Sequence, residues 1–486
     1  MNDTYDLIVI GGGPAGIVGA STAAGFGQTV ALVDNHAELG GAGVNTGTVP
    51  SKTLRETALA LSGMRSRNLY GVDLSLRREA TVSDFLRHER NVQHGLNAML
   101  SQRLAGSKSD VYRGTAAFED PHTILVQPTA GSEVIRLHSG HILIATGSSP
   151  VRPAIFPFDS PRVFDSDSIL SLEHLPKVMA VVGGGVIGSE YACTFSALGT
   201  KVHVIDTRDI LLPFLDLEIS HALVAAMERA GVEFHWKQKV QSCTENPGDR
   251  ITLCFAGGDS VDVDTVLVAA GRKSNTEELN LPAAGVTAPG KGVVIVDENF
   301  QTNVPGVYAA GDVIGFPALA STSMHQARLA MTHAFGQGSF HSPHLLPNGV
   351  YTIPEIGTIG ETEESLKQAG VDYVAGRWRY DANARGRIIG DVDGFLKLLF
   401  RCEDMKLLGV HAIGEHATEL VHIGMIAMLT NSGAALFTDA CFNVPTLGEL
   451  YKTASLDAVS RVQTGRSLAD FVSGIASAGK EYAAHE

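Results

Sequence analysis

Three glycines near the start of the chain have the spacing Gly-x-Gly-x-x-Gly between an apolar run and a helical pattern. They are Gly11, Gly13 and Gly16, and an acid, Asp34, closes the next apolar run. In such a turn the first glycine permits the tight bend, the second lets the backbone approach a pyrophosphate, and the third allows close helix packing. The acid accepts hydrogen bonds from ribose hydroxyls. In this strand and helix context the residues predict a dinucleotide-binding turn.

The same spacing recurs later at Gly183, Gly185 and Gly188, with Asp206 at the end of the following apolar run. Asp206 favours a dinucleotide with a free 2'-hydroxyl, as in NAD(H). Arg208 can pair with the 2'-phosphate of NADP(H), or it can be a solvated surface arginine. These residues leave open whether the second site takes NAD, NADP or both.

Both glycine patterns require a strand, a turn, a helix and a second strand. The segments DLIVIGGGPAG and VMAVVGGGVIG are nearly superimposable, which indicates an internal duplication. Between the two segments, residues 51–104 have helical periodicity. In a third part of the chain the patterns predict strands at 395–400 and 408–413 and helices from Glu419. We therefore expect an α/β protein with two Rossmann-like domains and a C-terminal α+β domain.

The bulk composition argues against several classes of protein. The chain has 486 residues and a formal charge of -15, which would repel a polyphosphate backbone, so we expect no nucleic-acid partner. Residues 7–32 are uncharged, but three consecutive glycines interrupt them, so we expect a buried βαβ unit and no membrane span. No basic region precedes this apolar run, so we expect no signal peptide and a cytoplasmic location.

Cysteine and histidine do not show the spacing of metal ligands. His411, His416 and His422 come at intervals of five and six, which does not place them on one helical face. No Cys-x-x-Cys pair occurs among the five cysteines, which are Cys193, Cys243, Cys254, Cys402 and Cys441. We therefore expect no metal and no disulfide framework.

Seven segments, taken in order, resemble one known family. They are GGGPAG, GTVPSK, ATGSSP, GGGVIGSEYA, AAGRKSN, TNVPGVYAAGDV and TIPEIGTIG. The chain resembles the pyridine nucleotide-disulfide oxidoreductases. The resemblance implies an FAD domain over residues 1–150 and 275–346, an NAD(P) domain over 151–274 and a C-terminal domain over 347–470 that forms a homodimer. It assigns no role to the tail, residues 471–486.

The resemblance also implies which residues hold the cofactors. Lys52 and Glu190 would form an ion pair that tunes the flavin at its N5 atom, Asp312 would contact the ribityl chain, and a helix starting near Ala320 would aim its positive end at the flavin. Without a role at the flavin, Lys52 would be a surface lysine, and Glu190 would be an acid near a helix N-terminus that complements the helix dipole. Further positions, which can also be ordinary turn residues, are Gly41, Gly114, Thr146 and Gly147 for FAD and Gly271 for NAD(P).

Three positions depart from the members of the family that reduce disulfides. Those members carry a Cys-x4-Cys pair where this chain has Gly43 and Thr48, and a histidine where it has Val444, although it keeps Glu449. Both thiols and the imidazole that serves them are therefore missing. Segments such as FNVPTLGELYKTASLD resemble the soluble, si-specific pyridine nucleotide transhydrogenases, and Gly43 is a departure even from that subgroup.

The resemblance therefore implies FAD-dependent hydride transfer from NADPH to NAD+, with both nucleotides using one site in turn and no redox disulfide. Two alternatives stay open. One is a diaphorase or quinone reductase, in which the flavin passes electrons to an external acceptor. The other is a non-catalytic FAD-binding subunit of a larger complex, which the two complete glycine patterns disfavour. The sequence does not decide the preferred direction, the nucleotide preference or the assembly beyond a dimer.

Overall fold

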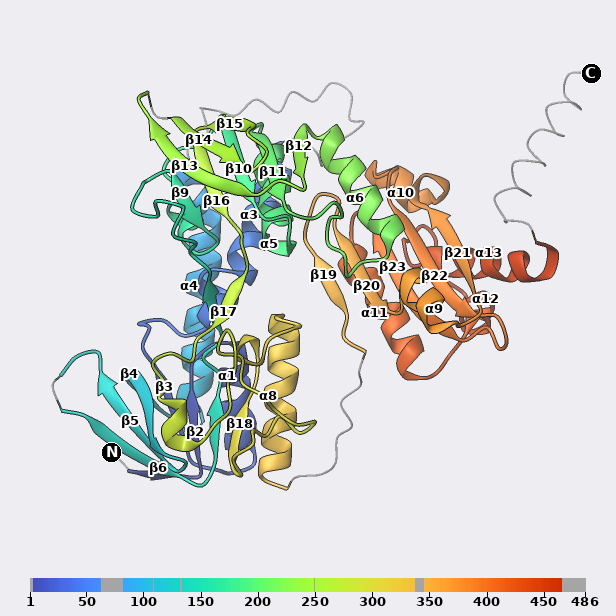
Figure 1. Ribbon diagram of the computed structural model, residues 1–486. Coiled ribbons are helices and arrows are strands. Elements are labelled where there is room, and N and C mark those ends of the chain that lie inside the picture. The colour runs from blue at the N-terminus through green and yellow to red at the C-terminus, as the bar shows by residue number, and fades with distance from the viewer. Residues whose placement is uncertain are drawn as a thin grey trace, which may run out of the picture.

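The computed structural model describes residues 3–62, 82–107, 109–131, 133–248, 250–336 and 345–465. The predicted tail, residues 471–486, lies outside these ranges. Figure 1 shows three bodies, built on three large sheets. No helix in the described ranges is long and apolar enough to cross a membrane.

The first body is built on an eight-stranded sheet of order β1-β6-β5-β4-β3-β2-β7-β18. Strands β2 and β3 are fully buried and apolar except for Asp34, as parallel strands covered on both faces should be. Helices α1 and α8 pack against each other beside this sheet (Figure 1). The strands are β1 (Thr4–Tyr5), β2 (Leu7–Ile10), β3 (Val30–Asp34), β4 (Ser109–Asp120), β5 (Thr123–Pro128), β6 (Ile135–Ser139), β7 (Ile142–Ile144) and β18 (Val307–Ala309).

Six helices belong to the first body in the part of the chain that the structure describes. Helical periodicity over residues 51–104 is confirmed within the described ranges by α3 and α4, which contact each other and run from the first body towards the second (Figure 1). The helices are α1 (Pro14–Gly25), α2 (Gly41–Asn45), α3 (Thr48–Leu61), α4 (Val82–Ala105), α7 (Leu281–Ala284) and α8 (Ala320–Ala334).

The second body repeats the first in a parallel sheet of order β12-β11-β10-β16-β9. Gly13 and Gly185 cap the equivalent helices α1 and α5 with nearly equal backbone angles, φ -78° and -77° and ψ -173° and -176°. The expected duplication is thus confirmed in three dimensions. The elements are β9 (Val163–Asp165), β10 (Val178–Val182), α5 (Val186–Ala197), β11 (Lys201–Asp206), α6 (Leu217–Arg229), β12 (Val232–Trp236), β13 (Val240–Asn246), β14 (Arg250–Phe255), β15 (Ser260–Val263) and β16 (Thr265–Val268).

The chain passes between these two bodies twice, and the crossings lie side by side. Strand β8 (Ser148–Pro150) leads out of the first body, β17 (Arg272–Ser274) leads back, and the two pair antiparallel. The predicted boundaries at 150 and 275 fall at this pair, while the division into domains stays a prediction.

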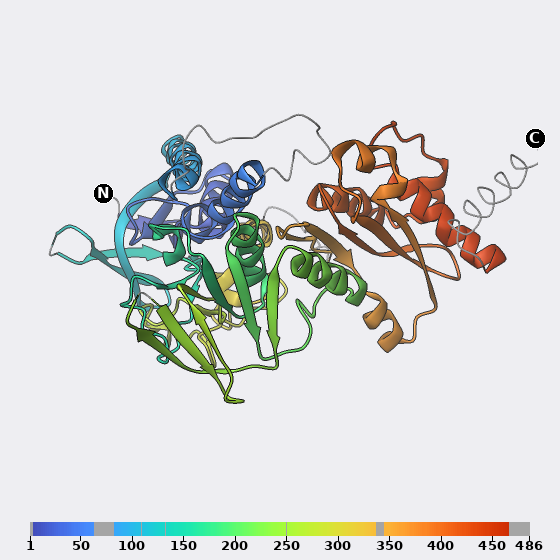
Figure 2. The same ribbon diagram turned by 90° about the horizontal axis from the view of Figure 1, so that it is seen from above.

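The third body is an antiparallel sheet of order β19-β20-β23-β22-β21 with helices packed on it (Figures 1 and 2). Both predicted strands are present, but the following helix begins at Ala417, two residues before Glu419, because His416 adopts a left-handed φ of 63° and caps it. The elements are β19 (Asn348–Val350), β20 (Ile356–Gly360), α9 (Glu363–Ala369), β21 (Tyr373–Arg379), α10 (Ala384–Ile389), β22 (Phe395–Arg401), β23 (Leu407–Ile413), α11 (Ala417–Leu429), α12 (Ala434–Asp439) and α13 (Leu450–Thr464).

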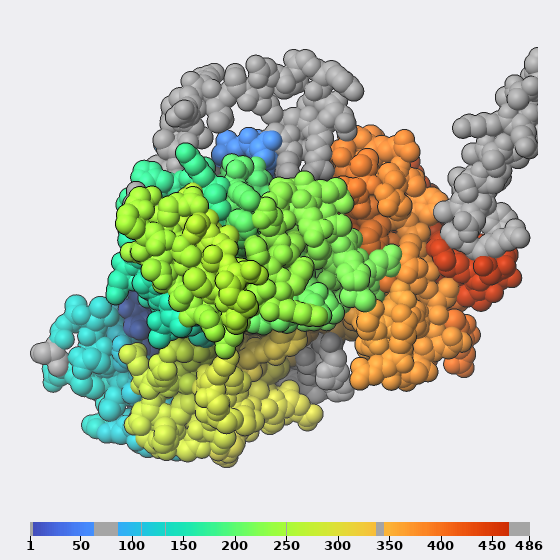
Figure 3. Space-filling view, turned by 45° about the horizontal axis from the view of Figure 1, so that its top comes forward, coloured from blue at the N-terminus to red at the C-terminus, as the bar shows by residue number. Residues whose placement is uncertain are grey.

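One hydrophobic cluster joins all three bodies. It contains Leu54 from α3, Met179 from β10 and Phe395 from β22, each with at most 9% of its surface exposed. Figure 3 shows the second body, in green, bordering both the yellow part of the first body below it and the orange third body to its right. The shared cluster fixes α3, α5 and the start of the third body against one another, and these are the elements that meet at the candidate site.

Candidate functional site

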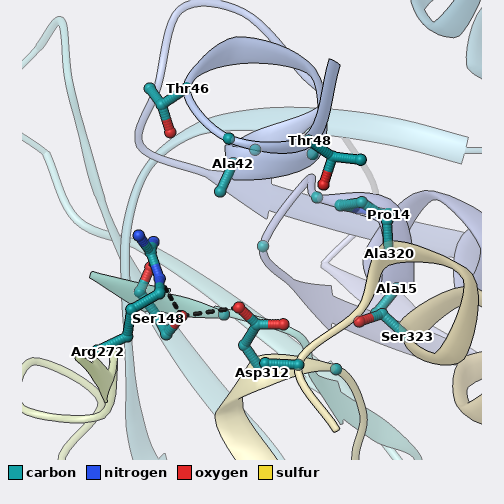
Figure 4. Close-up of a pocket in the computed structure, with 18 of the residues that line it drawn as sticks. Pro14, Ala15, Ala42, Thr46, Thr48, Ser148, Arg272, Asp312, Ala320 and Ser323 are labelled. Atoms are coloured by element: carbon teal, nitrogen blue, oxygen red, sulfur yellow. Dashed lines mark hydrogen bonds between the residues drawn. The ribbon is translucent and has the colours of Figure 1, made fainter. Parts of the chain in front are cut away.

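A cavity of about 890 Å³ lies where the first body meets α5 of the second and the start of the third. Figure 4 shows part of its wall, including Thr48 at the start of α3, Asp312 and Ala320 at the start of α8. The cavity brings together most of the residues predicted for FAD and the predicted ion pair. Those on its wall are Gly11, Gly13, Asp34, Gly41, Lys52, Gly114, Thr146, Gly147, Glu190, Asp312 and Ala320.

The first glycine turn is shaped for close approach of the backbone. Gly11 has a φ of 106°, and a Cβ on Gly16 would overlap the carbonyl oxygen of Gly11. Gly16 therefore supports the turn from behind, which explains why it does not line the cavity. The cap residue Gly13 has no side chain to bond the first N–H groups of α1, so those groups stay available to an anion.

Asp34 is held in place by its neighbours. Its Oδ2 accepts the Gly12 N–H at 2.5 Å, and its Oδ1 accepts the His36 N–H at 2.7 Å. Burial alone would raise the pKa of Asp34, but the hydrogen bonds from His36 and Gly12 outweigh it and hold the pKa below its ordinary value. Asp34 is therefore an ionised acceptor. Its Oδ1 is also contacted by the His36 ring Nδ1 at 3.1 Å, whereas Oδ2 keeps a further lone pair for a ribose hydroxyl.

Lys52 and Glu190 form the predicted ion pair. Lys52 Nζ lies 2.6 Å from Glu190 Oε2, and the two side chains are 25% and 6% exposed. Glu190 Oε1 accepts the Tyr351 N–H at 2.9 Å, and Lys52 Nζ lies 5.0 Å from the centre of the Tyr351 ring. Lys52 is thus not a solvated surface lysine. Three elements, α3, α5 and the segment between β19 and β20, position this pair on the wall of the cavity.

Asp312 is fixed by a chain of hydrogen bonds that Figure 4 shows. Ser148 Oγ donates to Asp312 Oδ2 at 2.7 Å, and Arg272 Nε donates to Ser148 Oγ at 2.8 Å. Arg272 and Ser148 also line the cavity, although no role was predicted for either. Arg272 directly follows Gly271 in the segment AAGRKSN. This motif does not predict that the Arg272 side chain contacts Ser148.

Helix α8 begins at the cavity wall. Ala318 to Ser321 line the cavity, and the cap residue Leu319 provides no side-chain hydrogen bond to the first turn. The helix is 15 residues long, so its N-terminal N–H groups carry the positive end of a full helix dipole. The positive end of this helix therefore lies at the cavity wall. His325 lies one turn further on, with Nδ1 2.7 Å from Arg328 Nη2, and does not line the cavity.

The loop positions around this cavity differ in how they contribute. Thr146 Oγ1 donates to the Asn275 carbonyl at 2.7 Å, which ties the first crossing to the second. Gly147 and Gly41 have φ values of 70° and 51°, and a Cβ on Gly114 would overlap the Gln127 carbonyl. The three glycines therefore shape the wall through the backbone, whereas Thr146 acts through its side-chain hydroxyl.

The positions that replace the family's thiols lie in the same cavity. Gly43 on α2 and Thr48 at the start of α3 both line it. A Cβ on Gly43 would come within 2.5 Å of Pro14 Cγ, so the site is closed to a larger side chain as it stands. Val444 is 59% exposed on the third body, and Glu449 contacts Asn383 at 3.4 Å. All five cysteines are free, and none lines this cavity in the part of the chain that the structure describes.

The second glycine turn lies outside this cavity. Gly183 has a φ of 107°, and a Cβ on Gly188 would overlap the carbonyl oxygen of Gly183, as in the first turn. The cap Gly185 again leaves the first N–H groups of its helix without a side-chain partner. Helix α5 connects the two sites, because it starts at this turn and presents Glu190 to the cavity one turn later. Gly271 has a φ of 100° at the start of β17.

Asp206 and Arg208 contact each other. Arg208 Nη2 lies 2.7 Å from Asp206 Oδ2, and Arg208 Nε lies 2.9 Å from Oδ1. Burial would raise the pKa of Asp206, but hydrogen bonds from Arg208 and the Gly184 N–H hold it below its ordinary value. The Arg208 side chain is 43% exposed, so part of its guanidinium stays accessible to a ligand while it pairs with Asp206. The predicted acceptor and the predicted phosphate ligand thus form one charged unit beside the turn.

The three histidines of the C-terminal body have separate environments. His411 is buried and contacts Thr358 Oγ1 at 2.6 Å and the Glu361 carbonyl at 2.9 Å. His416 caps α11, and His422 lines the cavity.

The chain matches the pyridine nucleotide-disulphide oxidoreductase family over residues 5–332 and the dimerisation domain of that family over residues 346–455. It is 44% identical to a soluble pyridine nucleotide transhydrogenase from Mycobacterium bovis, covering 94% of this chain and 98% of that one. A protein of the same description from Colwellia psychrerythraea is 38% identical, with 94% and 98% covered. Among solved structures, the Cu(II) complex of the HOCl-induced flavoprotein disulfide reductase RclA from Escherichia coli superimposes with a TM-score of 0.85 at 26% identity, covering 94% of this chain and 99% of that one.

Proposed function

Because this chain belongs to the pyridine nucleotide-disulphide oxidoreductase family, which implies the use of FAD and a nicotinamide dinucleotide, we propose that it transfers hydride from NADPH to NAD+. The observation that carries the proposal is the composition of one cavity wall. The Lys52–Glu190 pair stands on it, and Gly43 and Thr48 stand where disulfide-reducing relatives carry thiols. The names of the relatives at 44% and 38% identity support the same reaction.

The cavity fits FAD. Its glycine turn leaves the first N–H groups of α1 free for a pyrophosphate, and Asp34 Oδ2 offers a lone pair to a ribose hydroxyl. Asp312, held by Ser148, would bond the ribityl chain. The uncapped start of α8 would face the polar edge of the ring. FAD bound there supplies a ring that accepts a hydride and passes it on.

The residues of the chain have two tasks in this reaction. Lys52 would place a positive charge beside the bound ring, and its salt bridge to buried Glu190 holds the ammonium on the cavity wall. Helix α5 holds Glu190 and the Gly183 turn at a fixed separation, so a nucleotide seated on that turn directs its nicotinamide end towards the same cavity.

We propose a ping-pong order, because the two glycine turns are already divided between the cofactors. The turn at Gly11 would hold FAD, which leaves the turn at Gly183 for one nicotinamide dinucleotide at a time. NADP+ must therefore leave before NAD+ enters. We also propose, from the resemblance to the si-specific subgroup, that the nicotinamide meets the si face of the flavin.

The absence of a redox disulfide is part of the proposal. Gly43, Thr48 and Val444 offer no thiol and no imidazole at the positions that a thiol relay would use. The acceptor of the electrons is then a small molecule that enters the cavity. A second NAD(P) molecule needs no further protein group, because the Gly183 turn already provides its site.

We propose a homodimer in the cytoplasm. The dimerisation domain of the family spans residues 346–455, and apolar side chains on its helices α11 and α12 are exposed in the single chain, among them Ile423, Ile426 and Leu436. Burying such a patch against a second copy is the usual way to form an obligate interface. The relatives described as soluble transhydrogenases support the location.

A steady-state assay with NADPH and thio-NAD+ tests the reaction. The proposal expects thio-NADH to form with parallel double-reciprocal plots, which indicate that the first product leaves before the second substrate binds. In a matched assay, quinones replace thio-NAD+. Turnover with a quinone at least tenfold above turnover with thio-NAD+ would replace the proposal by the quinone-reductase alternative, and no turnover with either acceptor would favour a non-catalytic subunit.

A further inference from the structure

Two histidines and a glutamate meet on neighbouring strands at one edge of the second body. His203 lies on β11, and Glu233 and His235 lie on β12, the edge strand of the sheet. The strands pair parallel with His203 opposite Glu233 and Ile205 opposite His235. Residues 233 and 235 point to the same face of a strand, so this register brings the three side chains together.

The ligand atoms of this cluster are close. His203 Nδ1 lies 3.0 Å from His235 Nε2 and 3.2 Å from Glu233 Oε2. Three atoms that each bind a zinc ion at about 2.0 to 2.2 Å in tetrahedral directions lie roughly 3.3 Å from one another. The two separations of His203 Nδ1, 3.0 and 3.2 Å, are close to this value without any rearrangement of the backbone.

We propose that His203, Glu233 and His235 bind one divalent transition-metal ion of the zinc type, with water as the remaining ligand. Two imidazole nitrogens and a carboxylate oxygen form a ligand set that zinc uses with an open fourth position. Within the described ranges, this is the one group of three such side chains whose ligand atoms all lie within 4.8 Å of one another.

The surroundings suit a bound ion. His203 is 5% exposed and His235 is half-buried, whereas about half of the Glu233 side chain is exposed, so the cluster has a protein side and a solvent side. The His235 ring also packs 5.4 Å from the Phe255 ring, which limits its rotation. Burial lowers the pKa of both imidazoles, which favours their neutral, ligating form.

One neighbouring group opposes the ion. Lys201 Nζ lies 2.9 Å from Glu233 Oε1, on the same side of β11 as His203. Its ammonium competes with a metal for the carboxylate, so removal of Lys201 should strengthen binding. This opposite effect distinguishes a site built from these residues from loose association with surface histidines.

The cluster lies next to the proposed nucleotide site but does not belong to it. His235 stands opposite Ile205, one residue before Asp206, and the Gln238 N–H donates to the Asp206 carbonyl at 3.0 Å. An ion would thus link β11 to β12 just before the strands end. Because the ion binds the folded register and not the unfolded chain, it should raise the melting temperature.

Zn2+ titration of the chelator-treated, FAD-loaded protein tests the proposal. We expect one Zn2+ per chain and a higher melting temperature. Affinity should fall at least about tenfold in H235Q and in E233Q, and it should rise in K201A. The matched control is H221Q, which removes an exposed histidine on α6 of the same body and should change nothing. FAD content and circular dichroism confirm that each variant is folded.

Co2+ provides a second readout that does not depend on stability. A bound ion should give the strong visible absorption of a four-coordinate nitrogen and oxygen site, and H235Q should lose it. The proposal is overturned if the wild-type protein binds no Zn2+ at micromolar concentrations. It is equally overturned if H235Q, E233Q and H221Q bind Zn2+ as the wild type does.

Discussion

Lys52 Nζ donates to Glu190 Oε2 at 2.6 Å, although the two residues are separated by 138 positions in the chain. The pair joins α3 of the first body to α5 of the second. The Tyr351 N–H, from the third body, donates a hydrogen bond to the same carboxylate. A single buried carboxylate therefore holds the ammonium on the cavity wall and connects the parts of the chain that form the cavity.

Replacing Lys52 tests this relationship. K52M removes the positive charge at the ring and leaves buried Glu190 with the Tyr351 N–H alone, so we expect the rate of NADPH oxidation to fall about 10²-fold. Stopped-flow absorbance of the FAD-loaded protein measures this rate. In E190Q the ammonium keeps a neutral partner, and the loss should be smaller. If E190Q loses as much activity as K52M and the two losses add in the double variant, the two residues do not act as one functional unit.

The Asp206–Arg208 pair should control the choice of nucleotide. Arg208 is poised to exchange Asp206 for a 2'-phosphate, so R208A should raise the KM for NADPH about ten- to a hundredfold and leave the KM for NADH nearly unchanged. Steady-state kinetics with both donors measure the ratio. R229A is the control, since Arg229 is exposed on α6 of the same body and pairs with Asp393. An equal change for both donors would show that Arg208 does not read the phosphate.

Restoring the two cysteines should not restore disulfide chemistry. In G43C/T48C the Cβ atom of the new cysteine at position 43 would lie 2.5 Å from Pro14 Cγ, so the loop must shift. Val444 still provides no imidazole. We expect less than 1% of the turnover of a disulfide substrate relative to transhydrogenation, measured by NADPH oxidation. Efficient reduction of a disulfide by this variant would show that the missing thiols alone separate the two functions.

A buried charge cluster should govern stability between the second and third bodies. Lys397 is 1% exposed and lies 2.7 Å from Asp216 and 2.5 Å from Glu363. K397M leaves these carboxylates without their buried partner and should lower the free energy of unfolding by about 3 to 5 kcal/mol. Urea unfolding followed by circular dichroism measures the change. K367M is the control, because Lys367 contacts the same Glu363 at 3.5 Å from an exposed position and should cost little.

The same cluster predicts a dependence on pH. Despite burial, which raises it, the pKa of Glu363 is lowered to about 2 by hydrogen bonds from Lys397 and Tyr373. Because the folded pKa lies below the unfolded one, this carboxyl stabilises the fold fully above about pH 4.5, and the stabilisation is lost as the pH falls towards 2. Melting temperatures of wild type and E363Q should therefore differ at pH 6 and converge near pH 2. A difference that persists unchanged at low pH would contradict this assignment.

Local patterns predicted the parts of the site that local structure determines. The turns at Gly11 and Gly183 follow from spacing, because strand, turn and helix are consecutive in the chain. The Ser148–Arg272 contact was not predicted, since it depends on two crossings that pair side by side. The His203 cluster was missed for a similar reason: its members are spread over two strands, and the parallel register alone brings them together. The spacing of the histidines on the third body predicts no metal, and it carries no information about the two strands of the second body.

The most direct measurement of the central claim is anaerobic reduction and reoxidation of the FAD-loaded protein in two mixing steps. One equivalent of NADPH should bleach the flavin absorbance without the long-wavelength band that a thiolate beside the flavin produces, because Gly43 and Thr48 supply no thiol. Thio-NAD+ added next should restore the absorbance and form one equivalent of thio-NADH at least as fast as steady-state turnover. A long-wavelength band after the first step, or bleaching that persists in thio-NAD+, would contradict the account.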